Sequence, residues 1–139
     1  MAATTTTALS AKLNRNALLK KAKMRLKDAR VLRANKRYDG AMYLCGYAVE
    51  FALKATICRT LRWTEYLTSE PDYRSFKTHK LGALLTLSGR ELIIETRYLT
   101  EWSEVERWNP EARYDPNLQA TAKGSKLMIE STERLLGAL

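Results

Sequence analysis

Hydrophobic residues recur at helical spacing near the start of the chain. Between about Ser10 and Ala34, apolar positions three and four residues apart form one stripe beside a second stripe of basic residues, which predicts an amphipathic helix. The apolar stripe consists of Leu19, Ala22, Leu26 and Ala29. The sequence Tyr38-Asp39-Gly40 is expected to end this helix.

The next segment, from Ala41 to Arg62, is apolar on nearly all sides, which predicts the buried central helix of a bundle. Gly46 lowers its helix propensity by about 1 kcal/mol relative to alanine, so we expect a second helix to approach closely there. Cys45 and Cys58 are thirteen residues apart on this helix, roughly 20 Å along its axis, which is too far for a disulfide. Two buried thiols are therefore expected, as in a reducing cytoplasm.

Three more helices are predicted after a loop over Trp63–Thr78, which contains four aromatic residues and has room for a short helix. Thr78 is the expected N-cap of a helix over His79–Leu87 that ends at Ser88-Gly89. A fourth helix is predicted over Arg90–Trp108, with apolar positions at Leu92, Leu99, Trp102 and Val105.

The fifth helix is expected to start at Asp115-Pro116 and to continue to about Leu136. Its apolar side would carry Leu118, Ala122, Ile129, Thr132 and Leu136. No segment has a clear strand pattern, and glycine (6) and proline (3) are scarce. The sequence therefore predicts an all-α fold, an up-and-down bundle of four to five antiparallel helices.

The length of 139 residues suits a single domain over residues 1–139, with residues 1–8 as a disordered tail. No apolar run approaches the length of about 18 residues that would span a bilayer, so we expect no membrane contact. The single histidine and the two cysteines leave too few ligands for a zinc site. Because there is also no Gly-rich phosphate loop and no Glu-x-x-His motif, we expect neither a cofactor nor a metal.

The net charge of +9 comes from the first predicted helix. Eleven basic residues and one acid, Asp28, lie between Lys12 and Arg37, whereas the rest of the chain has 13 basic and 14 acidic residues. Such a face attracts polyanions such as RNA, and the candidate nucleic-acid-binding residues are Lys20, Lys23, Lys27 and Arg30. The alternative is that this helix packs against the acidic segment Glu91–Glu111, within one bundle or across a dimer.

Polar side chains on the central helix fall on one line. Tyr43, Tyr47, Glu50 and Lys54 follow one another at positions i, i+4, i+7 and i+11, and Glu50 precedes Lys54 at the favourable spacing for an ion pair. Because polar groups on a buried helix need partners, this line is either an internal polar network or the wall of a ligand cleft.

Two further groups are candidates for ligand contacts. His79 is expected at a helix start, where backbone N–H groups favour anions, although capping or packing is the commoner role of such a histidine. Trp108, Arg113 and Tyr114 lie before the last helix, where an arginine beside a tyrosine suits phosphate binding and base stacking. An arginine–carboxylate pair with a buried tyrosine is the simpler interpretation of that group.

Three stretches resemble the motifs of HEPN domains. The segment from Tyr43 to Ala55 is similar to the signature helix of that family, in which Gly/Gln-x-Ala-Val-Glu-x-x-Leu-Lys-Ala is typical. The sequence Thr78-His79-Lys80-Leu81 resembles the family's Thr-His-x-Leu helix start, and Arg113-Tyr114-Asp115-Pro116 resembles its Arg-Tyr-x-Pro turn. The motifs occur in the family's order.

The resemblance implies an all-α bundle, usually a homodimer, that binds a nucleotide or RNA and often acts with a minimal nucleotidyltransferase. Some HEPN proteins are metal-independent ribonucleases and toxins, and these carry an arginine, a spacer of about four to six residues and a histidine before the last helix. The corresponding stretch here, Arg113–Ala120, has no histidine, although the same spacing occurs in Arg74–His79.

The leading hypothesis is a non-catalytic, cytoplasmic HEPN-like domain that binds a nucleotide or RNA and partners a minimal nucleotidyltransferase or a toxin–antitoxin-type system. Its ligand-binding residues would be Tyr47, Glu50, Lys54, His79, Arg113 and Tyr114. The alternative is a metal-independent ribonuclease that uses Arg74 and His79, with His79 as general acid or base. A third possibility is an interaction module whose basic helix docks on an acidic protein.

Overall fold

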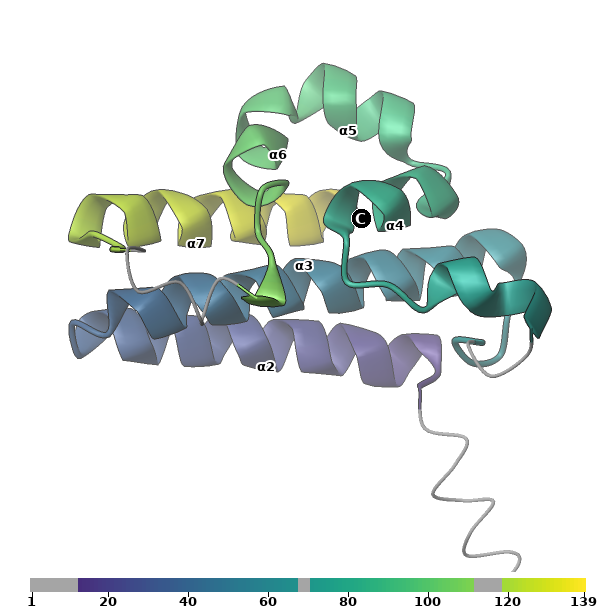
Figure 1. Ribbon diagram of the computed structural model, residues 1–139, viewed down its shortest axis with the longest axis horizontal. Helices are drawn as coiled ribbons and strands as arrows, with labels where there is room; N and C mark the ends of the chain where they lie inside the picture. Colours follow the sequence, from purple (N-terminus) through teal and green to yellow (C-terminus); the bar gives the residue numbers. More distant parts are fainter. Residues whose placement is uncertain (1–12, 68–70, 112–118) are drawn as a thin grey trace, which may run out of the picture.

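The computed structural model describes residues 13–67, 71–111 and 119–139 and arranges them as a helical bundle (Figure 1). The elements are α2 (Arg15–Ala34), α3 (Tyr38–Leu61), the 3-10 helix η1 (Pro71–Phe76), α4 (Leu81–Ser88), α5 (Glu91–Arg97), α6 (Leu99–Val105) and α7 (Ala122–Ala138). These described ranges contain helices and no strand, which confirms the predicted all-α class. The expected tail at residues 1–8, and Arg113, Tyr114, Asp115 and Pro116, lie outside the described residues.

Helices α2 and α3 form an antiparallel pair joined by a tight turn. The Asn14 side chain caps α2 by accepting a hydrogen bond from the Ala17 backbone N–H (2.8 Å). The helix buries Leu18, Ala22, Leu26 and Ala29, so Leu18 takes the place expected for Leu19, which is only half-buried. These small and medium side chains at a spacing of three and four residues bring α2 close to α3.

The break between these two helices lies earlier than predicted. Helix α2 ends at Ala34, and Tyr38-Asp39-Gly40 is the first turn of α3 rather than a helix stop. The turn itself is made by Asn35, Lys36 and Arg37, with Lys36 in the left-handed region (φ 60°). The Asn35 side-chain amide donates to the Val31 carbonyl (2.9 Å), which satisfies one of the free carbonyl groups at the helix end.

Helix α3 is the central helix of the bundle, as predicted. It packs against α2, α4 and α7 and buries residues on most of its sides, among them Val49, Leu53 and Ile57. Among the described residues, α3 is the helix that is long and apolar enough to cross a membrane, but 67% of its apolar window is buried inside the protein. That burial is expected of the core helix of a bundle.

Gly46 permits a close approach, but a side chain rather than a second helix makes it. The Trp108 ring lies directly over Gly46, and a Cβ atom placed there would be 2.0 Å from two of the ring atoms. The Trp108 indole N–H donates to the Tyr43 carbonyl (3.1 Å), which holds the ring in place. The expectation of a neighbouring helix at Gly46 was therefore wrong.

Helices α4 and α7 both run in the same direction as α3 (Figure 1). The start of α3 contacts the segment before α7, where the Ala120 backbone N–H donates to the Asp39 side chain (2.9 Å). At the far end of α3, the Thr60 hydroxyl donates to the Ser88 carbonyl at the end of α4 (2.7 Å). Helix α4 is therefore parallel to α3 rather than antiparallel to it (Figure 1).

The start of α4 differs from the prediction. Helix α4 begins at Leu81, so His79 precedes it, and Thr78 is not the N-cap. The Thr78 hydroxyl instead accepts a hydrogen bond from the Lys80 backbone N–H (3.1 Å), which forms a local turn before the helix. The predicted stop at Ser88-Gly89 is confirmed, with Gly89 in the left-handed region (φ 75°).

The predicted fourth helix is two short helices, because the backbone departs from helical geometry at Tyr98 (φ −129°, ψ 31°). Helix α5 contacts α4, whereas α6 contacts α7. The two short helices therefore do not share one continuous apolar face. Trp102 and Val105 are buried as expected, but Leu92 and Leu99 are 76% and 58% exposed.

The last helix begins later than predicted, at Ala122. Its N-cap is Thr121, whose side chain accepts from the Gly124 backbone N–H (2.9 Å). Ile129 and Thr132 are buried as expected, whereas Ala122 is exposed and Leu118 lies outside the described residues. The buried face is completed by Ser125, Met128, Ser131 and Leu135.

The basic helix and the acidic segment do not lie side by side within the protein. Helix α2 packs against α3 and α7, and α5 and α6 lie across the bundle from it (Figure 1). The contacts of α2 with α7 are an exposed salt bridge from Arg30 to Glu133 (3.0 Å) and hydrogen bonds from Arg33 to the Ala122 carbonyl and the Ser125 hydroxyl. Packing within one bundle therefore does not explain the basic face of α2.

Candidate functional site

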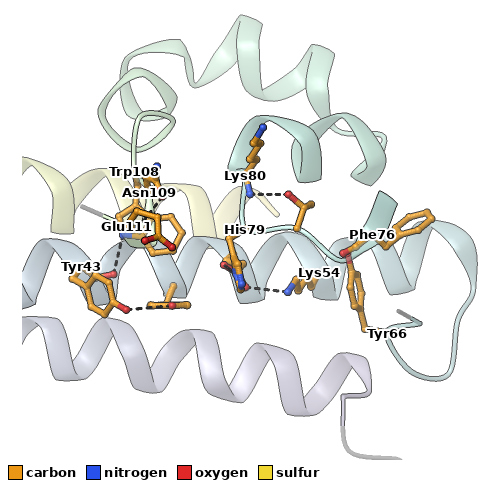
Figure 2. Close-up of polar contacts among 12 residues, drawn as sticks. Tyr43, Lys54, Tyr66, Phe76, His79, Lys80, Trp108, Asn109 and Glu111 are labelled. Carbon is orange, nitrogen blue, oxygen red and sulfur yellow. Dashed lines mark hydrogen bonds and ion pairs between the residues drawn. The ribbon is translucent and has the colours of Figure 1, made fainter. Parts of the chain in front are cut away.

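The carboxylate of Glu50 is the centre of a polar cluster on α3. Glu50 is 2% exposed. Its Oε2 atom lies 3.0 Å from Lys54 Nζ, one helical turn further along α3, and its Oε1 atom lies 2.8 Å from His79 Nδ1 (Figure 2). Two segments that are 29 residues apart in the chain therefore meet at one buried carboxylate.

The Lys54 ammonium compensates the buried charge of Glu50. A buried carboxylate without a partner is strongly unfavourable, and an ion pair at helical i,i+4 spacing requires no further backbone ordering. The Lys54 side chain is itself only 14% exposed, and its ammonium lies 5.2 Å from the centroid of the Tyr66 ring. The pair is therefore held on both sides, by His79 and by Tyr66.

Tyr66 is fixed beneath Lys54 by its own hydroxyl group, which donates to the Phe76 carbonyl (2.6 Å; Figure 2). Burial raises the pKa of the Tyr66 hydroxyl above its usual value, and the nearby Cys58 and Glu50 act in the same direction. The hydroxyl thus stays a neutral donor at physiological pH. In the sequence, Tyr66 is distinguished only as one of the four aromatic residues of the predicted loop over Trp63–Thr78.

His79 presents one ring nitrogen to the protein and leaves the rest of its ring accessible. Its side chain is 59% exposed, while Nδ1 faces Glu50. Because an ionised carboxylate only accepts hydrogen bonds, Nδ1 carries the proton, and the other nitrogen, Nε2, is left as an acceptor in the neutral ring. The ring can therefore accept a hydrogen bond or a proton from a ligand, or donate one when it is protonated.

Tyr47 links this cluster to Trp108. Its ring centroid lies 6.4 Å from that of His79 and 4.9 Å from that of Trp108, both in edge-to-face geometry. Its hydroxyl lies 3.3 Å from the Tyr43 hydroxyl one turn earlier on α3. Figure 2 shows side chains along α3 in the order Tyr43, Trp108, His79, Lys54 and Tyr66. The predicted polar line is therefore a continuous polar and aromatic surface.

The structure brings together four of the six predicted ligand-binding residues, namely Tyr47, Glu50, Lys54 and His79. Arg113 and Tyr114 lie outside the described residues. The residues that flank them are attached to the first half of α3, since Trp108 bonds to Tyr43 and Ala120 bonds to Asp39.

Arg74 is not part of this cluster. It is exposed on η1, and in the described ranges no hydrogen bond or salt bridge connects it to Glu50 or His79. The spacing of four residues between Arg74 and His79 thus does not by itself bring the two side chains together.

The basic face of α2 is largely available for binding. Lys20, Lys23 and Lys27 are exposed, and none of them forms a salt bridge within the described part of the chain. Arg30 differs, because it pairs with Glu133 at 3.0 Å. The predicted nucleic-acid-binding face thus consists of three unpaired lysines and one arginine that shares its charge with α7.

None of the four described candidate ligand residues, Tyr47, Glu50, Lys54 and His79, is among the described residues that line a hollow at one end of the bundle. This hollow has a volume of about 600 Å³ and lies at the turn between α2 and α3. Its walls are Leu32, Lys36, Arg37, Tyr38, Asp39, Gly40 and Ala120. Over the same described ranges, no group of three or more His, Cys, Asp and Glu side chains is placed to hold a metal ion.

Comparison with family models identifies this bundle. The model of the HEPN domain matches residues 16–139, which is nearly the whole chain, and the chain therefore belongs to the HEPN family. The match covers the three motifs around Glu50, His79 and Arg113, and it makes the protein a helical domain of nucleotide- or RNA-related function. Comparisons with curated proteins and with solved structures give no match.

Proposed function

We propose that this HEPN domain is a non-catalytic binding protein for a nucleotide or RNA. It acts as a homodimer in the cytoplasm, and as the partner of a minimal nucleotidyltransferase or of a toxin–antitoxin-type system. The convergence of Tyr47, Glu50, Lys54 and His79 on one face of α3 carries the proposal. Polar groups so arranged on an otherwise apolar helix suit a ligand better than they suit a core. The two free, buried cysteines fit a reducing compartment.

Each part of this surface has a distinct role in binding. The exposed edge of His79 offers a hydrogen bond, and Glu50 fixes the orientation of the ring. The Tyr47 ring lies next to Trp108 and offers an aromatic surface beside His79. The lysines of α2 add an attraction to phosphates that does not depend on sequence.

A salt titration of RNA binding tests the electrostatic part. The plot of log affinity against log salt has a negative slope, and each phosphate contact that is lost on single-stranded RNA makes it less steep by about 0.7. Replacing Lys20, Lys23 and Lys27 together by Gln should therefore make the slope less steep by about 2. Arg97→Gln, an exposed cation on α5, is the matched control and should leave the slope unchanged. An unchanged slope in the triple variant would show that α2 does not contact RNA.

Replacing His79 by Ala tests the cluster itself. The ion pair of Glu50 with Lys54 remains, so the fold should persist, which circular dichroism checks. Binding of an RNA oligonucleotide or of a nucleotide should weaken about tenfold, since a hydrogen bond to a charged phosphate contributes about 1.5 kcal/mol. Equal affinity in the folded variant would remove His79 from the site.

The ribonuclease alternative is favoured by one contact. The 2.8 Å contact of His79 with a buried carboxylate would set its ring for general acid–base work on a ribose 2′-OH. Incubation of bulk RNA with the protein in the presence of a metal chelator decides between the two functions. Cleavage that disappears in His79→Ala would overturn the non-catalytic proposal, and intact RNA with the wild-type protein would reject the ribonuclease.

A further inference from the structure

Four aromatic rings gather at the end of the bundle next to the Glu50 cluster. Trp63 contacts three of them, with centroid distances of 6.0 Å to Tyr66, 5.2 Å to Tyr73 and 4.8 Å to Phe76. Tyr66 is buried and anchors the group, whereas Trp63, Tyr73 and Phe76 are only half-buried. Part of the surface of three large aromatic side chains therefore faces solvent at one place.

Three basic residues are direct neighbours of these half-buried rings in the sequence. Arg62 precedes Trp63, Arg74 follows Tyr73 and Lys77 follows Phe76. Because the three rings are in contact, their neighbours along the chain are brought to the same end of the bundle. All three cations are exposed, and within the described residues none of them forms a salt bridge.

The cluster is continuous with the site on α3. The Phe76 carbonyl accepts the hydrogen bond of Tyr66, whose ring lies under the Lys54 ammonium (Figure 2). His79 follows Phe76 by three residues. A polyanionic chain bound at His79 and Lys54 could therefore extend over the aromatic rings without leaving the protein surface.

We propose that Trp63, Tyr73 and Phe76 form a stacking platform for an unpaired base of single-stranded RNA, with Arg62, Arg74 and Lys77 contacting the adjoining phosphates. This inference rests on the proposed RNA-binding function and adds the class of RNA that is bound. Every base has an aromatic face, so stacking on such rings is tolerant of sequence, but it requires a base that is not already stacked within a duplex. The platform therefore selects single strands over duplexes.

The test compares a single-stranded RNA of about 12 nucleotides with a duplex of the same length, by fluorescence anisotropy. Tyr73 is replaced by Leu, which keeps apolar bulk and removes the ring, and by Phe, which keeps the ring. Tyr98→Leu is the matched control, since Tyr98 is also half-buried but lies between α5 and α6. Circular dichroism establishes that each variant is folded.

Wild-type protein should bind the single strand more tightly than the duplex. Tyr73→Leu should weaken single-strand binding about tenfold, which is the effect of losing one stacked base, and should leave duplex binding and the salt slope unchanged. Tyr73→Phe and Tyr98→Leu should both bind the single strand as the wild type does.

Three outcomes would overturn the platform. Equal weakening of single-strand and duplex binding by Tyr73→Leu would indicate only a structural role for the ring. Unchanged single-strand binding by the folded Tyr73→Leu variant would remove the platform and leave the proposed RNA binding intact. A wild-type protein that binds neither RNA would refute the platform and RNA binding together.

Discussion

Replacement of Gly46 by Ala tests how the candidate site is built. Alanine favours a helix over glycine by about 1 kcal/mol, so the change should stabilise α3 if the space beside Gly46 were empty. The new Cβ atom would instead lie 2.0 Å from two ring atoms of Trp108. Carbon atoms do not approach closer than about 3.5 Å without strong repulsion, so the Trp108 ring has to leave its position.

The cost of this displacement follows from the contacts of Trp108. Truncation of a fully buried tryptophan costs about 3–5 kcal/mol, and about half of that applies to a half-buried ring such as this one. The hydrogen bond to the Tyr43 carbonyl contributes about 1 kcal/mol more. Against the gain in helix propensity, Gly46→Ala should destabilise the protein by about 2 kcal/mol.

The assay is urea denaturation followed by far-ultraviolet circular dichroism, in the wild type and in a Trp108→Ala background. Without the indole ring, Gly46→Ala should stabilise the protein by about 1 kcal/mol, so the sign of its effect reverses. Gly82→Ala in α4 is the control, because nothing lies within 4 Å of its Cβ position, and it should be neutral or stabilising in both backgrounds. Stabilisation by Gly46→Ala in both backgrounds would refute the placement of Trp108.

Three further predictions concern stability. Burial raises the pKa of the Cys45 thiol from 9.0 to about 11, so the thiol ionises at lower pH in the unfolded chain than in the folded protein. The free energy of unfolding should therefore fall as pH rises through this range. The midpoint of urea denaturation should fall less over the same range in Cys45→Ala. Arg33→Ala should lower the free energy of unfolding by about 1 kcal/mol, because its hydrogen bonds to α7 are lost. Arg30→Ala should lower it by at most about 0.5 kcal/mol, because the salt bridge of Arg30 is exposed. Equal losses in the two variants would contradict this difference. Leu92→Lys should leave the melting temperature unchanged, since Leu92 is 76% exposed.

Local patterns in the sequence were sufficient to predict the helices whose environment is uniform along their length. Helix α3 is apolar on most sides and is buried on most sides, and the basic stripe of α2 is exposed as the period of the helix requires. The line of Tyr47, Glu50 and Lys54 could be found because residues at i, i+3 and i+7 must share a helix face. The contact of Glu50 with Lys54 is likewise local.

Prediction was poorest where tertiary contacts compete with local preference. The single helix predicted over Arg90–Trp108 is divided at Tyr98, because α6 turns to pack against α7. The sequence of that segment contains no pattern that predicts this break. The occupant of the space beside Gly46 is likewise not encoded nearby, because Trp108 is 62 residues further along the chain. A glycine indicates that something approaches closely, but not what approaches.

The sequence by itself determined the helical class, the central helix, the charge of α2 and the family, because each depends on residue type and spacing along the chain. The tertiary structure alone decided that His79 meets Glu50, that Tyr66 lies under Lys54 and that the rings around Trp63 form one cluster. Each of those three features joins residues that are at least twelve positions apart in the sequence, so whether they meet depends on how the whole bundle packs rather than on local residue type.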